Sequence, residues 1–228
     1  HVMDSMTKVS HKAQVSANRI MEVLNTEPII KSPKNGIKDT ENKGTIEFEN
    51  VSFTYPNGEE PVIKDVSFSG KKGEVIAFIG STGSGKSTLI NLIPRFYDVT
   101  KGSIKIDGVD VRDYDLKYLR KKIGFIPQKT LLFTGSIANN IKFGKKDAEY
   151  KEVEDSAKIA QAYEFISNKP NKFDEIITVG GSNVSGGQKQ RLSIARAIVR
   201  KPDIYIFDDS FSALDFKTDA ILRKELRA

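Results

Sequence analysis

The feature that most constrains this chain is a glycine-rich stretch, Gly80–Ser87, which lies between a short apolar run and an apolar helical pattern. It reads GSTGSGKS and matches the spacing GxxxxGK[ST]. The run before it, EVIAFIG, predicts a strand buried on both faces of a parallel sheet, and KSTLINLIPRF after it predicts a helix. Glycines in such a loop let successive backbone N–H groups point at the β- and γ-phosphates of a nucleotide. The stretch therefore predicts a nucleotide site in an α/β domain.

Two side chains of this loop have predicted roles. Lys86 is expected to neutralise charge on the γ-phosphate, and Ser87 is expected to bind Mg²⁺. The alternative is an ordinary glycine-rich turn, which requires the four fixed positions of the motif to coincide by chance. The predicted nucleotide-binding residues of the loop are Gly80, Ser81, Thr82, Gly83, Ser84, Gly85, Lys86, Ser87 and Thr88.

A second apolar run, residues 204–210 (IYIFDDS), ends in two carboxylates. In proteins with a phosphate-binding loop, a carboxylate at a strand end reaches the magnesium ion. Asp208 is therefore the predicted metal ligand, and Asp209 could orient the attacking water as a base. The alternative is a strand end with two solvated acids before a turn.

A second predicted anion site lies in the sequence Ser185-Gly186-Gly187-Gln188, directly before a helical pattern. A serine and two glycine amides at a helix N-terminus present several donors to an anion. Ser185 alone would read as an N-cap, but the complete SGGQ stretch favours a binding role. One chain thus carries two predicted phosphate-binding helix ends.

The rest of the chain alternates strand and helix patterns. Residues 45–55 alternate apolar and polar side chains, and the turn residues PNGEE then predict a hairpin into VIKDVSF. IKIDG and KKIGFIPQ predict further strands, residues near 136–167 predict a helical insert, and QKQRLSIARAIVRKP predicts a helix closed by Pro202. This alternation predicts an α/β fold.

The first 44 residues are polar and charge-rich, and they predict a linker with one short amphipathic helix in VSANRIMEVLN before Pro28. The opening His-Val-Met reads equally well as an expression scar or as the start of a native fragment. No apolar run reaches the roughly 20 residues that span a bilayer, so the chain is expected to be soluble.

Composition removes several classes of function. The chain has no cysteine, and its two histidines are His1 and His11, which argues against zinc hydrolase and Ser-His-Asp chemistry. A net charge of +6 is compatible with a phosphate-bearing partner but does not identify which one.

These motifs together resemble the nucleotide-binding domains of ATP-binding cassette (ABC) transporters, particularly exporters, over residues 45–228. The signature is Val184-Ser185-Gly186-Gly187-Gln188, where the family most often has LSGGQ. The resemblance implies a P-loop ATPase fold with a RecA-like parallel core sheet, an N-terminal antiparallel β subdomain and a helical subdomain at about 129–190. It implies ATP and Mg²⁺ as cofactors, Tyr55 as the aromatic that stacks on adenine, Gln128 as a metal-contacting residue, and residues 212–215 as the D-loop. The implied catalytic residues are Asp209, Gln128 and Lys86, and the implied metal ligands are Ser87, Gln128 and Asp208.

The resemblance also implies partners and a location. Two such domains face head to tail, so that ATP lies between the glycine loop of one and Ser185–Gln188 of the other, and hydrolysis drives export through a membrane domain in the same polypeptide. The expected place is the cytoplasmic face of the plasma (inner) membrane, and residues 1–44 resemble the segment that follows the last membrane helix. A soluble cassette ATPase acting on DNA or the ribosome is the disfavoured reading, so no nucleic acid partner is expected.

Three positions depart from the family pattern. Asp209 stands where the family usually has a glutamate, and residues 179–183 (VGGSN) lack the acidic and basic pair common there. No histidine follows His11, although the family's switch histidine lies beyond the D-loop, so the strand that carries it is expected to lie outside this sequence. A domain without that strand should expose apolar surface. The aspartate favours a heterodimer in which this chain has a slow site, with a homodimer or a non-hydrolysing ATP switch as alternatives.

Overall fold

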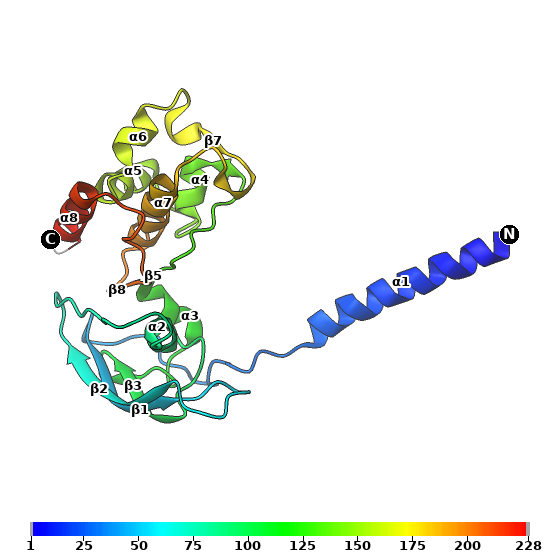
Figure 1. Cartoon of the computed structure of the whole chain (residues 1–228), viewed down its shortest axis with the longest axis horizontal. Helices are drawn as coiled ribbons and strands as arrows, with labels where there is room; N and C mark the ends of the chain where they lie inside the picture. Colours follow the sequence, from blue (N-terminus) through cyan, green and yellow to red (C-terminus); the bar gives the residue numbers. More distant parts are fainter. Residues whose placement is uncertain (1, 227–228) are drawn as a thin grey trace. The chain divides into compact units, whose positions relative to one another are not determined.

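The alternating residues after Thr45 form strand β1 (Ile46–Phe53), as expected. β1 pairs in antiparallel fashion with β2 (Ile63–Gly70) on one side and with β3 (Lys101–Ile106) on the other. With β4 (Val109–Asp110) they form one sheet in the order β2-β1-β3-β4 (Figure 1). The hairpin prediction is therefore confirmed.

The computed structural model describes residues 2–226, with side chains from residue 11 onward. It divides into one unit up to Lys31 and a second unit from Ser32. In the first unit, helix α1 (Val2–Asn25) ends before Pro28, as expected, but it is much longer than the predicted short helix. The reason is that no glycine or proline precedes Pro28, so nothing interrupts the helix upstream of its apolar residues. Among the described residues, no helix combines the length and apolarity needed to cross a bilayer.

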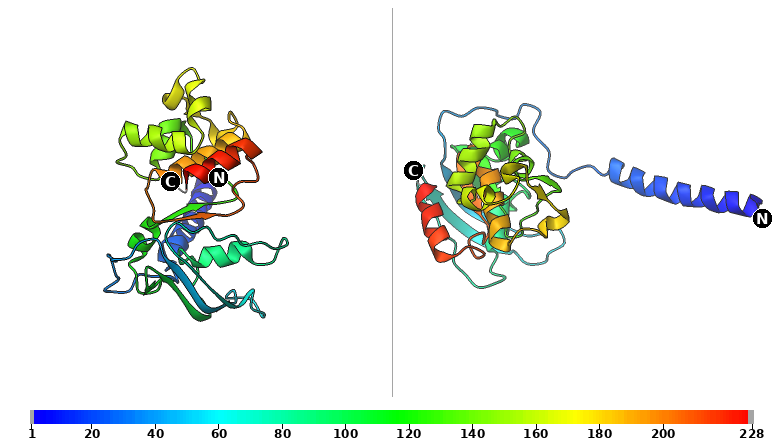
Figure 2. Two further views of the ribbon diagram at one scale, coloured as in Figure 1. Left: turned by 90° about the vertical axis from the view of Figure 1, so that its left-hand side faces the viewer. Right: turned by 90° about the horizontal axis from the view of Figure 1, so that it is seen from above.

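The second unit contains a parallel pair of strands, β5 (Ile123–Ile126) and β8 (Ile204–Phe207), in register from Ile123 opposite Ile204 to Ile126 opposite Phe207. Successive side chains of a strand point to opposite faces. In β8, Ile204 and Ile206 pack into the apolar cluster beneath the antiparallel sheet, whereas Tyr205 and Phe207 pack against the cluster of the helical part. This strand pair therefore joins the two cores, and the left view of Figure 2 shows the green and orange strands between the two parts of the second unit.

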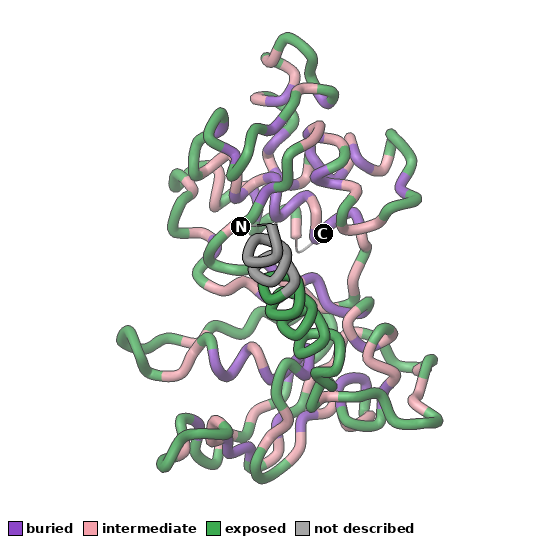
Figure 3. The backbone as a smooth tube through the Cα atoms, turned by 90° about the vertical axis from the view of Figure 1, so that its right-hand side faces the viewer, coloured by how far each residue is buried: buried purple, intermediate pink, exposed green. Residues whose placement is uncertain are grey.

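The helical part of the second unit carries the signature sequence and follows β5 in the chain (Figure 1). Its elements are β6 (Gly135–Ser136), α4 (Ile137–Lys142), α5 (Tyr150–Ile159), α6 (Tyr163–Ser167), the 3-10 turn η1 (Lys172–Asp174), β7 (Ile176–Ile177), the 3-10 turn η2 (Val179–Gly181), α7 (Gly186–Ile198) and, after β8, α8 (Phe216–Glu225). Buried segments run through both parts of the second unit (Figure 3). The predicted helical insert and the predicted helix before Pro202 are confirmed.

One predicted strand is wrong. The run EVIAFIG before the glycine loop has no strand structure, and Val75 and Ile79 are 62% and 96% exposed instead of buried. Among the described residues β5 and β8 pair only with each other, and residues 74–80 pair with neither strand. An apolar run becomes a buried strand only where such partners exist.

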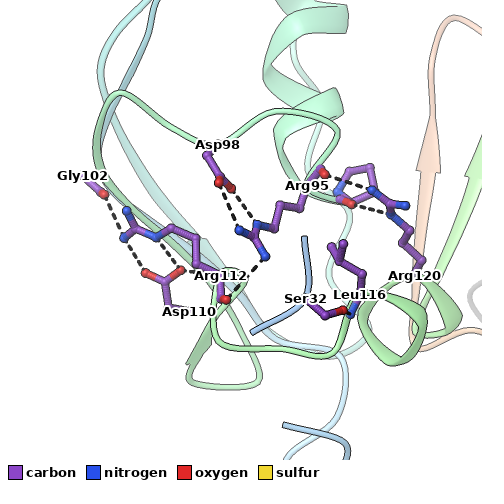
Figure 4. Close-up of polar contacts among 9 residues, drawn as sticks. Ser32, Arg95, Asp98, Gly102, Asp110, Arg112, Leu116 and Arg120 are labelled. Carbon is purple, nitrogen blue, oxygen red and sulfur yellow. Dashed lines mark hydrogen bonds and ion pairs between the residues drawn. The ribbon is translucent and has the colours of Figure 1, made fainter. Parts of the chain in front are cut away.

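The helix that follows the glycine loop, α2 (Lys86–Leu92), is anchored at its far end by arginines (Figure 4). Arg120 of α3 (Leu116–Lys121) donates from Nε to the Pro94 carbonyl at 3.1 Å and from Nη2 to the Arg95 carbonyl at 3.1 Å. Arg95 in turn pairs with Asp98 through Nε at 2.6 Å. Charged donors on backbone carbonyls are among the stronger hydrogen bonds, so they hold the C-terminal end of α2 in place.

A buried charge group, hereafter the Lys122 cluster, consists of Lys122, Asp107, Asp203 and Thr40. Lys122 Nζ lies 2.8 Å from Asp107 Oδ2 and 2.7 Å from Asp203 Oδ2, and its side chain is only 4% exposed. Thr40 contacts both Lys122 and Asp107 through its hydroxyl. Burial of the ammonium group lowers its pKa, but the hydrogen bonds and charges of the two aspartates outweigh burial and raise the pKa of Lys122 overall. The cluster holds residues 40–45 against the first residues of β5 and β8.

A more exposed charge group lies at the start of α5. Glu152 accepts hydrogen bonds from Lys145 Nζ at 2.8 Å to both carboxylate oxygens and from Lys201 Nζ at 3.0 Å. It also accepts from the backbone N–H of Glu149 at 3.1 Å, which completes a capping box for the helix. The hydrogen bonds from Lys145 and then Lys201 lower the pKa of Glu152 to about 2.

Candidate functional site

The carboxyl ends of β5 and β8 bring two predicted site residues together. Because the strands are parallel and in register, the residues that follow them leave the same edge of the pair. Gln128 Nε2 donates to Asp209 Oδ2 at 3.2 Å, and both side chains are exposed. Asp209 has a backbone φ of 47°, in the left-handed region that aspartate tolerates better than most residues. This turn directs its carboxylate toward Gln128.

The adjacent carboxylate joins this edge to the glycine loop. Ser87 Oγ, in the first turn of α2, donates to Asp208 Oδ1 at 2.8 Å, although 121 residues separate the two in sequence. The backbone N–H of Asp208 donates to the Ile126 carbonyl at 3.0 Å, so β5 fixes the position of the carboxylate. A hydroxyl oxygen and a carboxylate oxygen this close together are oxygen ligands of the kind that Mg²⁺ binds together with phosphates and water.

The glycine loop has the backbone shape that its sequence predicts. Gly83 and Gly85 have φ values of 82° and 91°, which are favourable only for glycine, and Gly85 caps α2. Lys86 Nζ donates to the Gly80 carbonyl at 2.7 Å and to the Ser81 carbonyl at 2.8 Å. The lysine therefore lies across its own loop, where a bound phosphate would exchange these carbonyl contacts for charged oxygens.

Tyr55 lies beside the same helix. Its hydroxyl is 2.9 Å from Thr88 Oγ1, and its ring packs edge-on against Phe53 and Tyr97, with centroid distances of 4.9 and 5.2 Å. The ring is half-buried at the end of β1, close to the residues that follow the glycine loop. This position is compatible with contact to a base whose phosphates lie on the loop.

The signature sequence forms a helix N-terminus, as predicted. Ser185 caps α7: its Oγ accepts from the Gln188 N–H at 3.2 Å, and Gln188 Oε1 accepts from the Ser185 N–H at 3.1 Å. The capping reading of Ser185 is thus correct, and it leaves the hydroxyl hydrogen available for donation. A Cβ on Gly187 would lie 2.9 Å from the Ala213 carbonyl, whereas one on Gly186 would meet nothing within 4 Å. Among the described residues, no hydrogen bond joins Ser185–Gln188 to the glycine loop.

The predicted D-loop runs into α8 through Asp215. The Asp215 carboxylate accepts from the Thr218 N–H at 2.9 Å and from the Thr218 hydroxyl at 2.7 Å, and so caps the helix. These hydrogen bonds, that of the hydroxyl first, hold the pKa of Asp215 below its usual range. The Asp215 carboxylate is therefore held in place at the start of α8.

Sequence reasoning missed two polar residues next to this site. Thr130 Oγ1 donates to Gln190 Oε1 at 2.7 Å and thereby ties the segment after Gln128 to α7. Gln190 precedes Ile194 and Ile198 by four and eight residues, which places it on the buried face of α7. A glutamine on an apolar helical face was the signal that could have drawn attention to it.

Comparison with known proteins shows the family. The sequence profile of the family described as "ABC transporter" matches residues 63–212. The uncharacterized ABC transporter ATP-binding protein YfiB of Bacillus subtilis (strain 168) is 48% identical over 211 residues, which cover 92% of this chain and 36% of that protein. The putative multidrug export ATP-binding/permease protein YgaD of the same strain is 41% identical over 211 residues, with the same coverage of 92% and 36%.

A solved structure gives the same result. The structure of a bacterial Atm1-family ABC exporter with ATP bound superposes with a TM-score of 0.87 at 32% identity, over 95% of this chain and 38% of that chain. The chain thus spans little more than a third of the length of these relatives. With its glycine loop, paired strand ends and signature helix in the family's order, the chain belongs to the ABC transporter family, as an ATP-binding domain.

Proposed function

We propose that this chain binds Mg²⁺-ATP and hydrolyses it to ADP and phosphate within a head-to-tail dimer of ATP-binding domains, and that hydrolysis drives export through a membrane domain. The observation that carries the proposal is the convergence of the Ser87–Asp208 pair and the Gln128–Asp209 pair at one strand edge. An export role agrees with the name of YgaD, a putative multidrug export protein, and with the similar structure of an Atm1-family exporter.

The residues of the site have separate tasks in this proposal. Lys86 exchanges its carbonyl contacts for γ-phosphate oxygens and offsets their charge. Ser87, Asp208 and Gln128 offer the oxygens that would hold Mg²⁺, whose chemistry is to neutralise the phosphate charge that develops during transfer. Asp209, held by the Gln128 amide, orients the attacking water and accepts its proton. Tyr55 stacks on the adenine.

The signature residues act on the partner's nucleotide in this scheme. Ser185 donates its hydroxyl hydrogen, and the N–H groups of Gly186 and Gly187 at the start of α7 face the same anion. Among the described residues no hydrogen bond joins these groups to the glycine loop of their own chain. This separation supports the proposal that a second ATP-binding domain supplies the nucleotide they bind.

Asp209 favours a slow site in this chain and a heterodimer. Aspartate is one methylene shorter than the usual glutamate, about 1.5 Å by bond geometry, and a misplacement of about 1 Å can cost ~10²-fold in rate. The chain would then contribute an intact signature to a faster partner. Residues 179–183, which lack the family's charged pair, agree with this assignment. A homodimer is the alternative if aspartate suffices.

A second candidate function is an ATP-operated switch with little turnover. It too rests on Asp209, since a carboxylate too far from the water would leave ATP binding intact. In both cases the expected place is the cytoplasmic face of the plasma (inner) membrane, as part of a transporter polypeptide, with no nucleic acid partner.

The test is steady-state Mg²⁺-ATP hydrolysis by the full transporter polypeptide with Asp209 and with Asp209→Glu. The control is Asp113→Glu, an exposed aspartate outside the site. A gain of ten-fold or more with glutamate, absent in the control, supports the slow site. Equal and substantial rates support a competent aspartate and a homodimer, and a chain that binds ATP but hydrolyses none with either residue supports the switch. Failure to bind ATP would refute the proposal.

A further inference from the structure

The segment that follows Gln128 is fastened to the signature helix by side chains of that helix. Thr130 Oγ1 donates to Gln190 Oε1 at 2.7 Å. One residue further on, the Leu131 carbonyl accepts from Arg196 Nη1 at 2.9 Å. Both Gln190 and Arg196 belong to α7, so the position of this segment depends on the position of α7.

The Gln190 amide uses only one of its two polar atoms in a hydrogen bond. The side chain is 3% exposed, and its Nε2 has no hydrogen-bond partner among the described residues. Turning the amide over would satisfy Nε2 at the Thr130 hydroxyl but leave Oε1 unpaired, so either orientation leaves one polar atom unsatisfied. Buried polar groups without partners are unfavourable. The Thr130 hydroxyl is therefore the one side-chain partner that orients the buried amide of Gln190 among the described residues.

The geometry of α7 connects this contact to both halves of the site. Gln190 lies five residues after Ser185, which at 1.5 Å per residue is roughly 7.5 Å along a rigid helix. Thr130 lies two residues after Gln128, whose amide holds Asp209 at 3.2 Å. The Thr130–Gln190 pair is thus the short polar connection between the signature end of α7 and the pair Gln128–Asp209.

We propose that Gln190 is a positioning residue that couples the place of Gln128 to the signature helix through Thr130. When the signature end of α7 engages a nucleotide, the Thr130–Gln190 hydrogen bond transmits the displacement of α7 to the segment after Gln128 and so sets the separation between Gln128 and Asp209. The inference rests on the proposed hydrolysis of ATP and assigns a role to residues outside the nucleotide contacts.

The test uses Thr130→Val and Gln190→Met, which keep size and remove the hydrogen bond, in the full transporter polypeptide. We expect each to lower kcat about five-fold, roughly the factor of one net hydrogen bond, and to raise the Mg²⁺ concentration for half-maximal rate. The KM for ATP should stay within about two-fold, because neither residue contacts the nucleotide. Thr130→Ser, which keeps the hydroxyl, should stay within about two-fold in kcat.

Two comparisons decide the result. The double variant should lose no more than either single variant, because both remove one contact. Ser103→Ala, which removes a hydroxyl bond to Glu49 at 2.8 Å in the antiparallel sheet, should leave kcat unchanged. Unchanged kcat in Thr130→Val with only a lower unfolding midpoint, or losses that multiply in the double variant, would overturn the inference. If Gln190→Met does not fold, the Thr130→Val and Thr130→Ser pair decides it.

Different results would refute the proposed function and this inference. Absence of ATP turnover in the unsubstituted transporter would refute the hydrolytic function, and the inference with it. Turnover in the unsubstituted transporter that Thr130→Val leaves unchanged would refute the inference alone.

Discussion

Replacement of Lys122 by methionine should destabilise the fold more than any replacement of a surface lysine. Methionine keeps most of the volume of the lysine stem but removes the ammonium group that lies 2.8 Å from Asp107 and 2.7 Å from Asp203. The Asp107 side chain has no exposed surface, so its charge would remain in the interior. Removing one partner of a buried ion pair costs about 3–5 kcal/mol.

The structure places the expected loss at the lower end of that range. Asp107 keeps a hydrogen bond from the Thr45 N–H at 2.9 Å and one from the Thr40 hydroxyl at 3.3 Å, and Asp203 is 28% exposed and can be hydrated. We therefore expect about 3 kcal/mol at pH 7 for Lys122→Met. The control is Lys151→Met, which removes an exposed pair with Asp155 at 2.9 Å and should cost at most about 0.5 kcal/mol.

Urea unfolding followed by far-UV circular dichroism measures both losses, and its pH dependence tests the cause. Because the pKa of Lys122 is raised in the fold, its contribution is complete below the unfolded value of about 10.4 and is lost as pH rises through the folded value. The difference between the unsubstituted chain and Lys122→Met should be constant up to about pH 10 and then narrow. A loss under about 1 kcal/mol at pH 7, or a difference independent of pH up to 11, would refute the reasoning.

Three further outcomes are expected. Lys86→Ala should weaken binding of a fluorescent ATP analogue by about 10- to 100-fold, the value of a charge-assisted hydrogen bond, and unchanged affinity would contradict the phosphate assignment. Gly187→Ala should be less stable in urea than Gly186→Ala by about 1 kcal/mol or more. The Cβ of alanine at position 187 would lie 2.9 Å from the Ala213 carbonyl, whereas Gly186→Ala gains helix propensity. Equal stability of the two variants would show that the D-loop moves to accommodate the added Cβ. The carboxyl carbon of Glu152 should titrate near pH 2 in an NMR experiment. The stabilising contribution of this carboxylate is therefore present above its unfolded-state pKa of about 4.3 and is lost as pH falls toward 2. A titration midpoint near pH 4.3 would show that its contacts with the lysines are not maintained.

The elements that could be predicted are those whose sequence pattern is local. Alternation in residues 46–53 predicts β1 because one face of that strand is buried and the pattern has a period of two. Gln128, through the family resemblance, and Asp209, through its place after an apolar run, were each predicted as site residues, and the parallel register of β5 and β8 brings them together. In these places one stretch of chain contains most of the information.

The features that escaped prediction depend on contacts distant in sequence. Residues 74–80 are apolar enough for a buried strand, but a strand also needs a neighbour, and no local pattern states whether one is present. Lys122 meets Asp107 and Asp203 across 15 and 81 residues, and Thr130 meets Gln190 across 60. Polar residues scattered in this way have no periodicity, so only the folded chain shows that they are partners.

The Lys122 cluster also has a mechanical consequence. It fastens residues 40–45 to the first residues of β5 and β8, and the same two strands end at Gln128, Asp208 and Asp209. Four residues of strand span only about 13 Å, and a hydrogen-bonded pair of strands is stiff over so short a length. A force on the chain before residue 45 therefore acts at the start of β5 and β8. The short strand pair transmits the resulting displacement to Gln128, Asp208 and Asp209 at its other end, so tension in the N-terminal segment changes the geometry of the site.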